Sequence, residues 1–153
     1  MNFREERTFP ITVDYNRSLE EMIAAGNYHG HISDMIKGCP ISGEGVHHLD
    51  LVLVAIEGEM YIDSVRIALS QRGLRAATIE ELLALGEQHP ELQRNFPIMA
   101  LGSVWDCPHT GASTVPSLYQ HGREGAKERT LYDVSDTGGF WGMGRYAAIR
   151  ETI

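Results

Sequence analysis

The stretch from Leu49 to Tyr61 constrains the fold more than any other part of this chain. Successive side chains of a strand point to opposite faces, and here both faces are apolar. The alternating residues are Leu51, Leu53 and Ala55 on one face, and Val52, Val54 and Ile56 on the other. A strand that is apolar on both faces belongs at the centre of a sheet that is covered on both sides. We therefore expect a central strand here.

Other patterns place helices and further strands around it. Ser18 to Glu21 and Thr78 to Glu81 both have the form of a capping box, which starts a helix. Between them, residues 62–73 repeat apolar side chains at helical spacing and end at a glycine. Alternating or continuous apolar runs predict the strands at residues 11–15, 49–61, 98–105, 115–119, 129–134 and 145–150.

This order of elements predicts an α+β fold with a mixed, mostly antiparallel sheet and about three helices. The helices are expected mainly in the N-terminal two-thirds of the chain and the strands mainly in the C-terminal third. A length of 153 residues suits one domain. We expect residues 1–10 to form a loose charged arm and residues 11–153 to form a single globular domain.

Charge and cysteine content limit the partners. The chain has 13 basic and 21 acidic residues, a formal charge of -8, which disfavours nucleic acid and anionic membranes as partners. No apolar stretch approaches the ~20 residues of a membrane span. The charged start has no signal-peptide pattern, and there are only two cysteines, so we expect a cytoplasmic protein with free thiols. No pattern indicates an oligomeric state.

The seven histidines raise the question of a metal site. His29 and His31 are two residues apart, so on a strand they would share a face, and His47 and His48 are adjacent. Zinc takes three or four such ligands, and no further motif completes a set. Two interpretations stay open: a zinc site that uses these four histidines, or histidines in surface turns with no cofactor.

The common catalytic patterns are absent. Gly102-Ser103-Val104-Trp105 lacks the second glycine of a nucleophile elbow. Cys107 lies near His109, but a nucleophile and its base usually meet across the fold rather than along the chain. These observations favour a binding protein over an enzyme.

The most unusual segment is residues 137–144, in which Phe140 and Trp141 lie among four glycines. Rigid aromatic side chains on such a loop offer contact area to a ligand, although a tight turn whose tryptophan fills the core is the competing interpretation. The contact candidates, in this segment and the loop-rich region before it, are Asp106, His109, Tyr119, His121, Phe140, Trp141 and Arg145.

Three functions follow from these patterns. The first is a non-enzymatic domain that binds a small ligand or a protein. The second is a histidine-based metal-binding protein or metal-dependent enzyme. The third is an acidic inhibitor that imitates nucleic acid, which requires the carboxylates to gather on one face.

Two resemblances accompany this reading. Residues 15–26, 77–86, 96–104 and 141–150 resemble segments of a family of short, uncharacterised bacterial proteins, a likeness that carries no activity with it. Residues 73–81 are similar to a helix start in formylglycine-generating-type proteins of the C-type-lectin-like fold. In this chain Ala77 replaces the proline of that pattern, and the catalytic cysteine pair is not evident. This resemblance therefore implies a ligand-binding fold without the oxidase activity.

Overall fold

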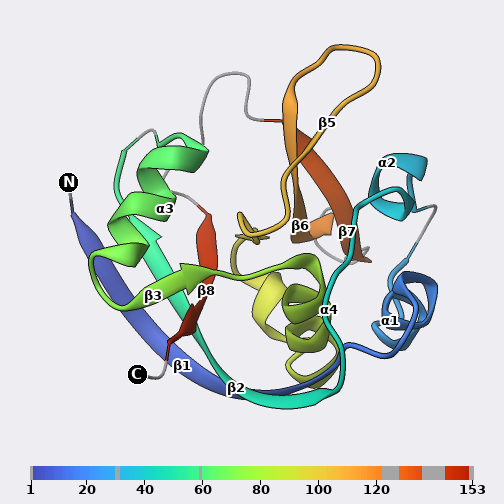
Figure 1. The fold of residues 1–153 in the computed structure, drawn as a ribbon, viewed down its shortest axis with the longest axis horizontal. Coiled ribbons are helices and arrows are strands. Elements are labelled where there is room, and N and C mark those ends of the chain that lie inside the picture. The colour runs from blue at the N-terminus through green and yellow to red at the C-terminus, as the bar shows by residue number, and fades with distance from the viewer. Residues whose placement is uncertain (1, 30–31, 59, 122–127, 136–143, 152–153) are drawn as a thin grey trace.

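The computed structural model describes residues 2–29, 32–58, 60–121, 128–135 and 144–151. The helices in this part are α1 (Leu19–Ala25), α2 (Asp34–Lys37), α3 (Ile62–Ser70) and α4 (Ile79–Gln88), with a 3-10 turn at Leu92–Arg94 (Figure 1). The strands are β1 (Phe3–Asp14), β2 (Val46–Ile56), β3 (Leu74–Ala76), β4 (Ile98–Met99), β5 (Trp105–Asp106), β6 (Ser113–His121), β7 (Glu128–Ser135) and β8 (Arg145–Arg150).

The strands form one sheet in the order β1-β2-β8-β4-β6-β5, with β3 also paired to β8 and β7 paired to β6. All of these pairings are antiparallel except the one between β4 and β8. The structure therefore confirms the prediction of an α+β fold with a mixed, mostly antiparallel sheet.

The predicted central strand is β2, which pairs with β1 on one side and β8 on the other. Its C-terminal half is buried on both faces, as its apolar pattern requires. Leu51 and Leu53 belong to the core under α1 and α4, whereas Val52 and Val54 belong to the core under α3. The helices thus cover opposite faces of the sheet, with α3 on the left of Figure 1 and α1 on the right.

The predicted segregation of helices and strands is wrong. The two longest strands, β1 and β2, lie within the first 56 residues of the chain, and the helices alternate with strands along the sequence. Residues 1–10, expected as a loose arm, contribute residues 3–10 to β1, where they pair with the end of β2. Their charged side chains are mostly exposed, so the local sequence carries little strand signal and the pairing with β2 fixes the conformation.

The β1 strand lies at the edge of the sheet, and several features block its further pairing. Exposed charged side chains and a bulge between Glu5 and Arg7 occupy its first half. In its second half, the Gln88 side chain accepts a hydrogen bond from the Thr12 amide at 3.0 Å and donates one to the Thr12 carbonyl at 2.7 Å. Such devices protect an edge strand from pairing with another chain.

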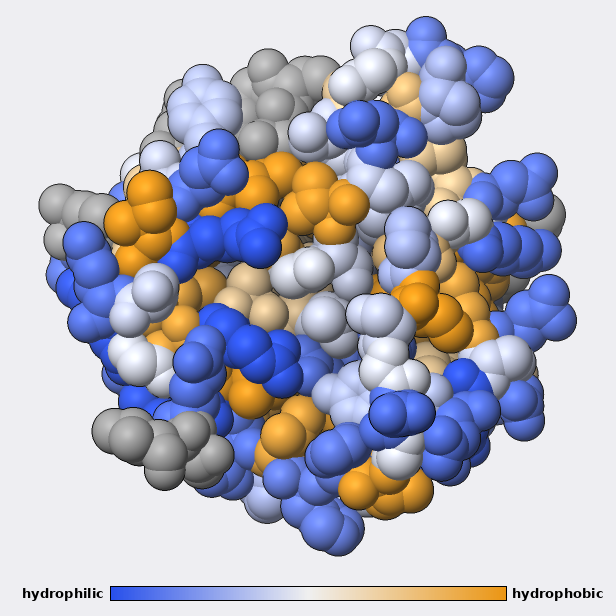
Figure 2. Space-filling view, viewed as in Figure 1, coloured by the Kyte–Doolittle hydropathy of each residue, from blue (hydrophilic) through white to orange (hydrophobic). Residues whose placement is uncertain are grey.

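The visible surface is mixed in character. Figure 2 shows apolar side chains in separate small groups bordered by hydrophilic ones. Among the described residues, the large apolar side chains that are exposed are Ile41, Val46, Tyr61 and Ile67, which come from three separate stretches of the sequence. No helix in the described part of the chain has the length and apolar character needed to cross a membrane.

Candidate functional site

A pocket of about 350 Å³ opens where the ends of β1 and β2 meet β3 and the first turn of α4. We call it the Tyr15 pocket. It is lined by the loop 42–44 together with Tyr15, His47, Leu49, Arg75, Thr78 and Glu81. Pockets that bind small molecules have volumes of about 300–1,000 Å³, and the volume of this one lies near the lower end of that range.

A buried carboxylate holds the floor of the Tyr15 pocket together. Glu81 is 1% exposed and accepts four hydrogen bonds. Arg75 donates two of them, at 2.8 and 2.7 Å, in a bidentate arrangement. Tyr15 donates the third at 2.5 Å and the Thr78 amide donates the fourth at 2.8 Å. The network joins the end of β1, strand β3 and helix α4 through a single side chain.

The network keeps its charges fixed near neutral pH. Burial by itself would raise the pKa of Glu81, but the hydrogen bonds from Arg75, Tyr15 and the Thr78 amide lower it below its usual value. Burial, followed by the hydrogen bond to Glu81, raises the pKa of Tyr15. The carboxylate therefore stays ionised and the phenol stays protonated, so neither group is suited to exchange protons with a substrate at neutral pH.

Arg75 is the part of this network that reaches solvent, since its side chain is 39% exposed. A guanidinium has five N–H groups; two are used on Glu81, and Nη1 also donates to the Ala76 carbonyl oxygen at 3.5 Å. Further N–H groups therefore lie on a side chain whose position is set by a buried partner. Because the positive charge is already balanced by Glu81, the arrangement suits a neutral hydrogen-bond acceptor.

Tyr15 and His47 form an aromatic wall, with their rings edge to face and 5.4 Å between centroids. The Nε2 atom of His47 lies 2.9 Å from the Glu44 carbonyl oxygen. Because a carbonyl only accepts, Nε2 carries the proton, and Nδ1 of the neutral ring is an acceptor. The wall thus combines flat apolar surface with one hydrogen-bond acceptor.

The loop that closes the pocket depends on a glycine. Gly43 has a φ of 125°, and a Cβ added there would lie 2.7 Å from the Tyr15 ring. The loop is tied to the β1 end by hydrogen bonds from the Tyr15 amide to the Gly45 carbonyl at 2.9 Å and from the Gly45 amide to the Asn16 side chain at 3.0 Å. The Tyr15 ring is consequently packed against the loop backbone.

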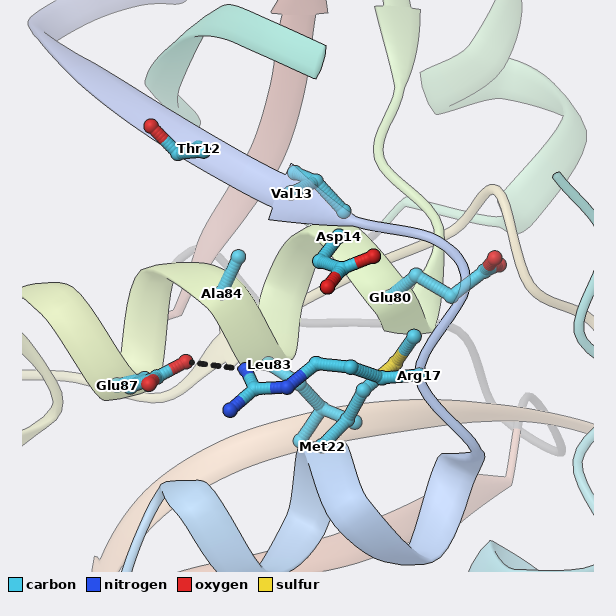
Figure 3. Close-up of a pocket in the computed structure, with 9 residues that line it drawn as sticks. All are labelled: Thr12, Val13, Asp14, Arg17, Met22, Glu80, Leu83, Ala84 and Glu87. Carbon is cyan, nitrogen blue, oxygen red and sulfur yellow. Dashed lines mark hydrogen bonds and ion pairs between the residues drawn. The ribbon is translucent and has the colours of Figure 1, made fainter. Parts of the chain in front are cut away.

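A second, much smaller cavity lies beside α4, between this helix, the end of β1 and α1 (Figure 3). Its volume of about 10 Å³ has room for roughly one water molecule. An ion pair of 3.1 Å between Arg17 and Glu87 crosses it, while Glu80 extends away from that pair. Burial raises the pKa of Glu80, which is 2% exposed. This cavity is too small for an organic ligand.

The ligand-contact residues predicted from the sequence have different neighbours in the structure. Asp106 and His109 are exposed on β5 and the turn after it. Tyr119 packs edge to face on Tyr132 at 5.5 Å, and Arg145 binds Glu6 and lies over the Phe96 ring at 4.4 Å. The remaining candidates, Phe140, Trp141 and the side chain of His121, lie outside the described residues.

The four histidines of the zinc hypothesis also have different surroundings. His47 turns toward Tyr15, while the neighbouring His48 lies 3.0 Å from the Thr12 hydroxyl on the opposite face of β2. His29 is exposed and accepts a hydrogen bond from the Arg129 amide at 3.1 Å, and His31 lies outside the described residues. In the described part of the chain, no three His, Cys, Asp or Glu side chains are grouped so as to hold a metal ion.

Of the predicted site residues that the structure describes, His47 alone lines the Tyr15 pocket. Sequence reasoning placed Glu81 in a capping box, and that box is formed, with Thr78 at the N-cap. It missed that the same carboxylate also binds Arg75 and Tyr15. Arg75 precedes the capped helix by only a few residues, and this charge pair was the available signal; Tyr15 is 66 residues from Glu81 and had none.

Comparisons with known proteins found no relative of this chain. No protein-family model matches the chain, and no curated protein or solved structure matches it significantly.

Proposed function

We propose that this chain is a non-enzymatic ligand-binding domain whose Tyr15 pocket takes a small, flat, neutral molecule that carries an amide or a similar carbonyl group. The observation that carries the proposal is the bidentate pair of Arg75 and Glu81. It presents a fixed guanidinium to a pocket of about 350 Å³ while cancelling its charge.

The lining groups match the two ends of such a ligand. A carbonyl oxygen can accept from the exposed side of Arg75, and an amide N–H can donate to Nδ1 of His47. A flat ring can pack on Tyr15, His47 and Leu49, since aromatic surfaces supply much of the binding energy at small-molecule sites. The fixed protonation states of Glu81 and Tyr15 support binding rather than acid–base catalysis.

We extend the proposal to a cytoplasmic location. Cys39 is buried, Cys107 is partly exposed, and neither forms a disulfide. Free thiols are typical of a reducing compartment.

The proposal is tested by titrating benzamide into the ¹⁵N-labelled protein and following the backbone amide signals. Benzamide combines a flat ring with a neutral amide. We expect saturable shifts at Tyr15, His47 and Thr78, and weaker binding of benzoate, because its carboxylate meets the nearby Glu44 and Glu81.

Two neighbouring histidines provide a matched pair of variants. His47→Ala removes part of the pocket wall and is expected to weaken benzamide binding by about fivefold, or roughly 1 kcal/mol. His48→Ala removes the same side chain on the other face of β2 and should leave binding unchanged. Equal effects of the two substitutions, or benzamide shifts that do not map to the pocket, would reject the proposal.

A further inference from the structure

Another pocket, of about 390 Å³, is lined by positively charged side chains, which is unusual in this acidic protein. Its lining residues are His29, Arg94, Asn95, Gln120 and Arg129. We call it the Arg94–Arg129 pocket. Two guanidinium groups, an imidazole and two side-chain amides line it, and no carboxylate is among the lining residues that the structure describes. The chain as a whole has a formal charge of -8, so this local excess of positive charge opposes the overall trend.

Arg129 is held firmly in this pocket. Its guanidinium donates to the carbonyl oxygen of Gly26, just after α1, and at 2.7 Å to that of Gly86, in α4. It also lies over the Tyr28 ring, 5.0 Å from the centroid. The position of this cation is therefore fixed by two helices, since the carbonyl groups near helix C-termini attract positive charge.

Carboxylates do not balance these cations within the described part of the chain. Neither Arg94 nor Arg129 forms an ion pair with a described carboxylate. The Nε atom of Arg129 is buried, and no described atom accepts a hydrogen bond from it. Arg94 is exposed, and no side-chain hydrogen bond joins it to a residue in the described part of the chain. An anion in the pocket would supply the missing negative charge.

His29 adds a donor of defined orientation. Its Nδ1 atom accepts a hydrogen bond from the Arg129 amide at 3.1 Å, and its own amide donates to the Arg129 carbonyl at 2.9 Å. Because Nδ1 is an acceptor, the proton of the neutral ring lies on Nε2. The side-chain amides of Asn95 and Gln120 offer further N–H groups. The pocket is therefore lined by groups that can donate hydrogen bonds.

We propose that the Arg94–Arg129 pocket is a second binding site, distinct from the Tyr15 pocket, for the phosphate group of a small molecule. Arginine pairs with phosphate through two parallel N–H···O bonds, and two arginines can share one doubly charged group. The Arg129 guanidinium is committed to carbonyl groups and supplies the local positive field, while Arg94, His29 and the two amides contact the phosphate oxygens. A free inorganic ion and a phosphate ester both carry this group, and the two probes of the test separate these sources.

The test uses inorganic pyrophosphate and methyl phosphate as probes, titrated into the full chain by calorimetry, with backbone amide shifts to locate the site. We expect saturable binding with shifts at Asn95, Gln120 and Arg129. Binding of both probes would support a site for phosphate esters, whereas binding of pyrophosphate alone would support a site for the inorganic ion. The absence of saturable binding by either probe would overturn the proposal.

Two exposed arginines give matched variants with the same change in net charge. Arg94→Gln removes the pocket guanidinium and should weaken pyrophosphate binding by about tenfold, the effect of one lost charge-assisted contact. Arg66→Gln removes an exposed arginine from α3, outside this pocket, and should change binding by less than about twofold. If both substitutions weaken binding equally, the attraction is a general effect of net charge and the site does not exist.

Discussion

Arg75 and Glu81 form an unequal ion pair, in which the carboxylate is 1% exposed and the guanidinium side chain is 39% exposed. The buried partner accepts four hydrogen bonds, and the exposed partner lines the Tyr15 pocket. One buried side chain thus fixes both the start of α4 and the arginine that we assign to ligand binding.

Breaking the Arg75–Glu81 pair should lower the free energy of unfolding more than breaking an ion pair on the surface. Glu81→Gln leaves Arg75 without a counter-charge and replaces one carboxylate oxygen with an NH2 group, so that either Tyr15 or the Thr78 amide loses its acceptor. We expect a loss of about 2–3 kcal/mol in the free energy of unfolding, below the value for a fully buried pair because water screens Arg75. Glu87→Gln, in the partly exposed pair with Arg17, should cost less than about 1 kcal/mol in the same urea titration. Similar losses for both variants would contradict this assignment.

The same pair should make the free energy of unfolding depend on pH in the acid range. The pKa of Glu81 is lower in the folded protein than its usual value of 4.5, so the unfolded chain takes up its proton first as the pH falls. The stabilisation is therefore complete above that value and is lost as the pH falls through the lowered pKa. The difference in unfolding free energy between the natural protein and Glu81→Gln should shrink between pH 5 and pH 3. A constant difference across this range would exclude the ionised pair as its source.

Gly102 is required by a close backbone contact. A Cβ at this position would lie 2.6 Å from the carbonyl oxygens of Ala76 and Ala77, next to the hydrogen bond from the Gly102 amide to Ala77. Gly102→Ala should lower the unfolding free energy by at least about 2 kcal/mol, because the backbone has to move. Gly58→Ala is the control: its φ is 93° and nothing lies within 4 Å, so it should cost only about 1 kcal/mol of backbone strain. Thermal unfolding compares the two, and equal losses would argue against the contact.

Gln88 is expected to protect the edge of the sheet. Gln88→Ala removes both hydrogen bonds to the Thr12 backbone and should lower the unfolding free energy by about 1 kcal/mol. It also exposes an unpaired backbone segment of β1, so self-association should increase with concentration. Light scattering after size-exclusion chromatography measures this. If the variant stays in the same association state as the natural protein, the exposed charges and the bulge of β1 protect the edge without Gln88.

The parts of the fold that were predictable are those with a local cause. The alternation around Leu51 to Ile56 identified the central strand, and both capping boxes formed as the residue types require. The first half of β1 was not predictable, because its residues are charged and exposed and only the distant β2 holds them extended. The predicted strand at residues 98–105 is instead two short strands, β4 and β5, on either side of the turn at Gly102.

The candidate site, too, was predictable only where its features have a local cause in the sequence. His47 was singled out as a metal-ligand candidate, and the structure places it beside Tyr15 in the lining of the Tyr15 pocket. The pairing of Glu81 with Tyr15 joins positions 66 residues apart, which no sequence period links. The Arg94–Arg129 pocket likewise brings His29 beside Arg129 of β7, 100 residues away in the sequence, so its lining residues come from distant parts of the chain.

The most direct test of the ligand-binding function is the position of benzamide on the protein, measured as nuclear Overhauser effects between its ring protons and protein side chains. The arrangement of the pocket predicts contacts to the Tyr15 ring, the His47 ring and the Leu49 methyl groups, all of which line it. Contacts that are confined to other surfaces of the protein, with none to these three side chains, would contradict it.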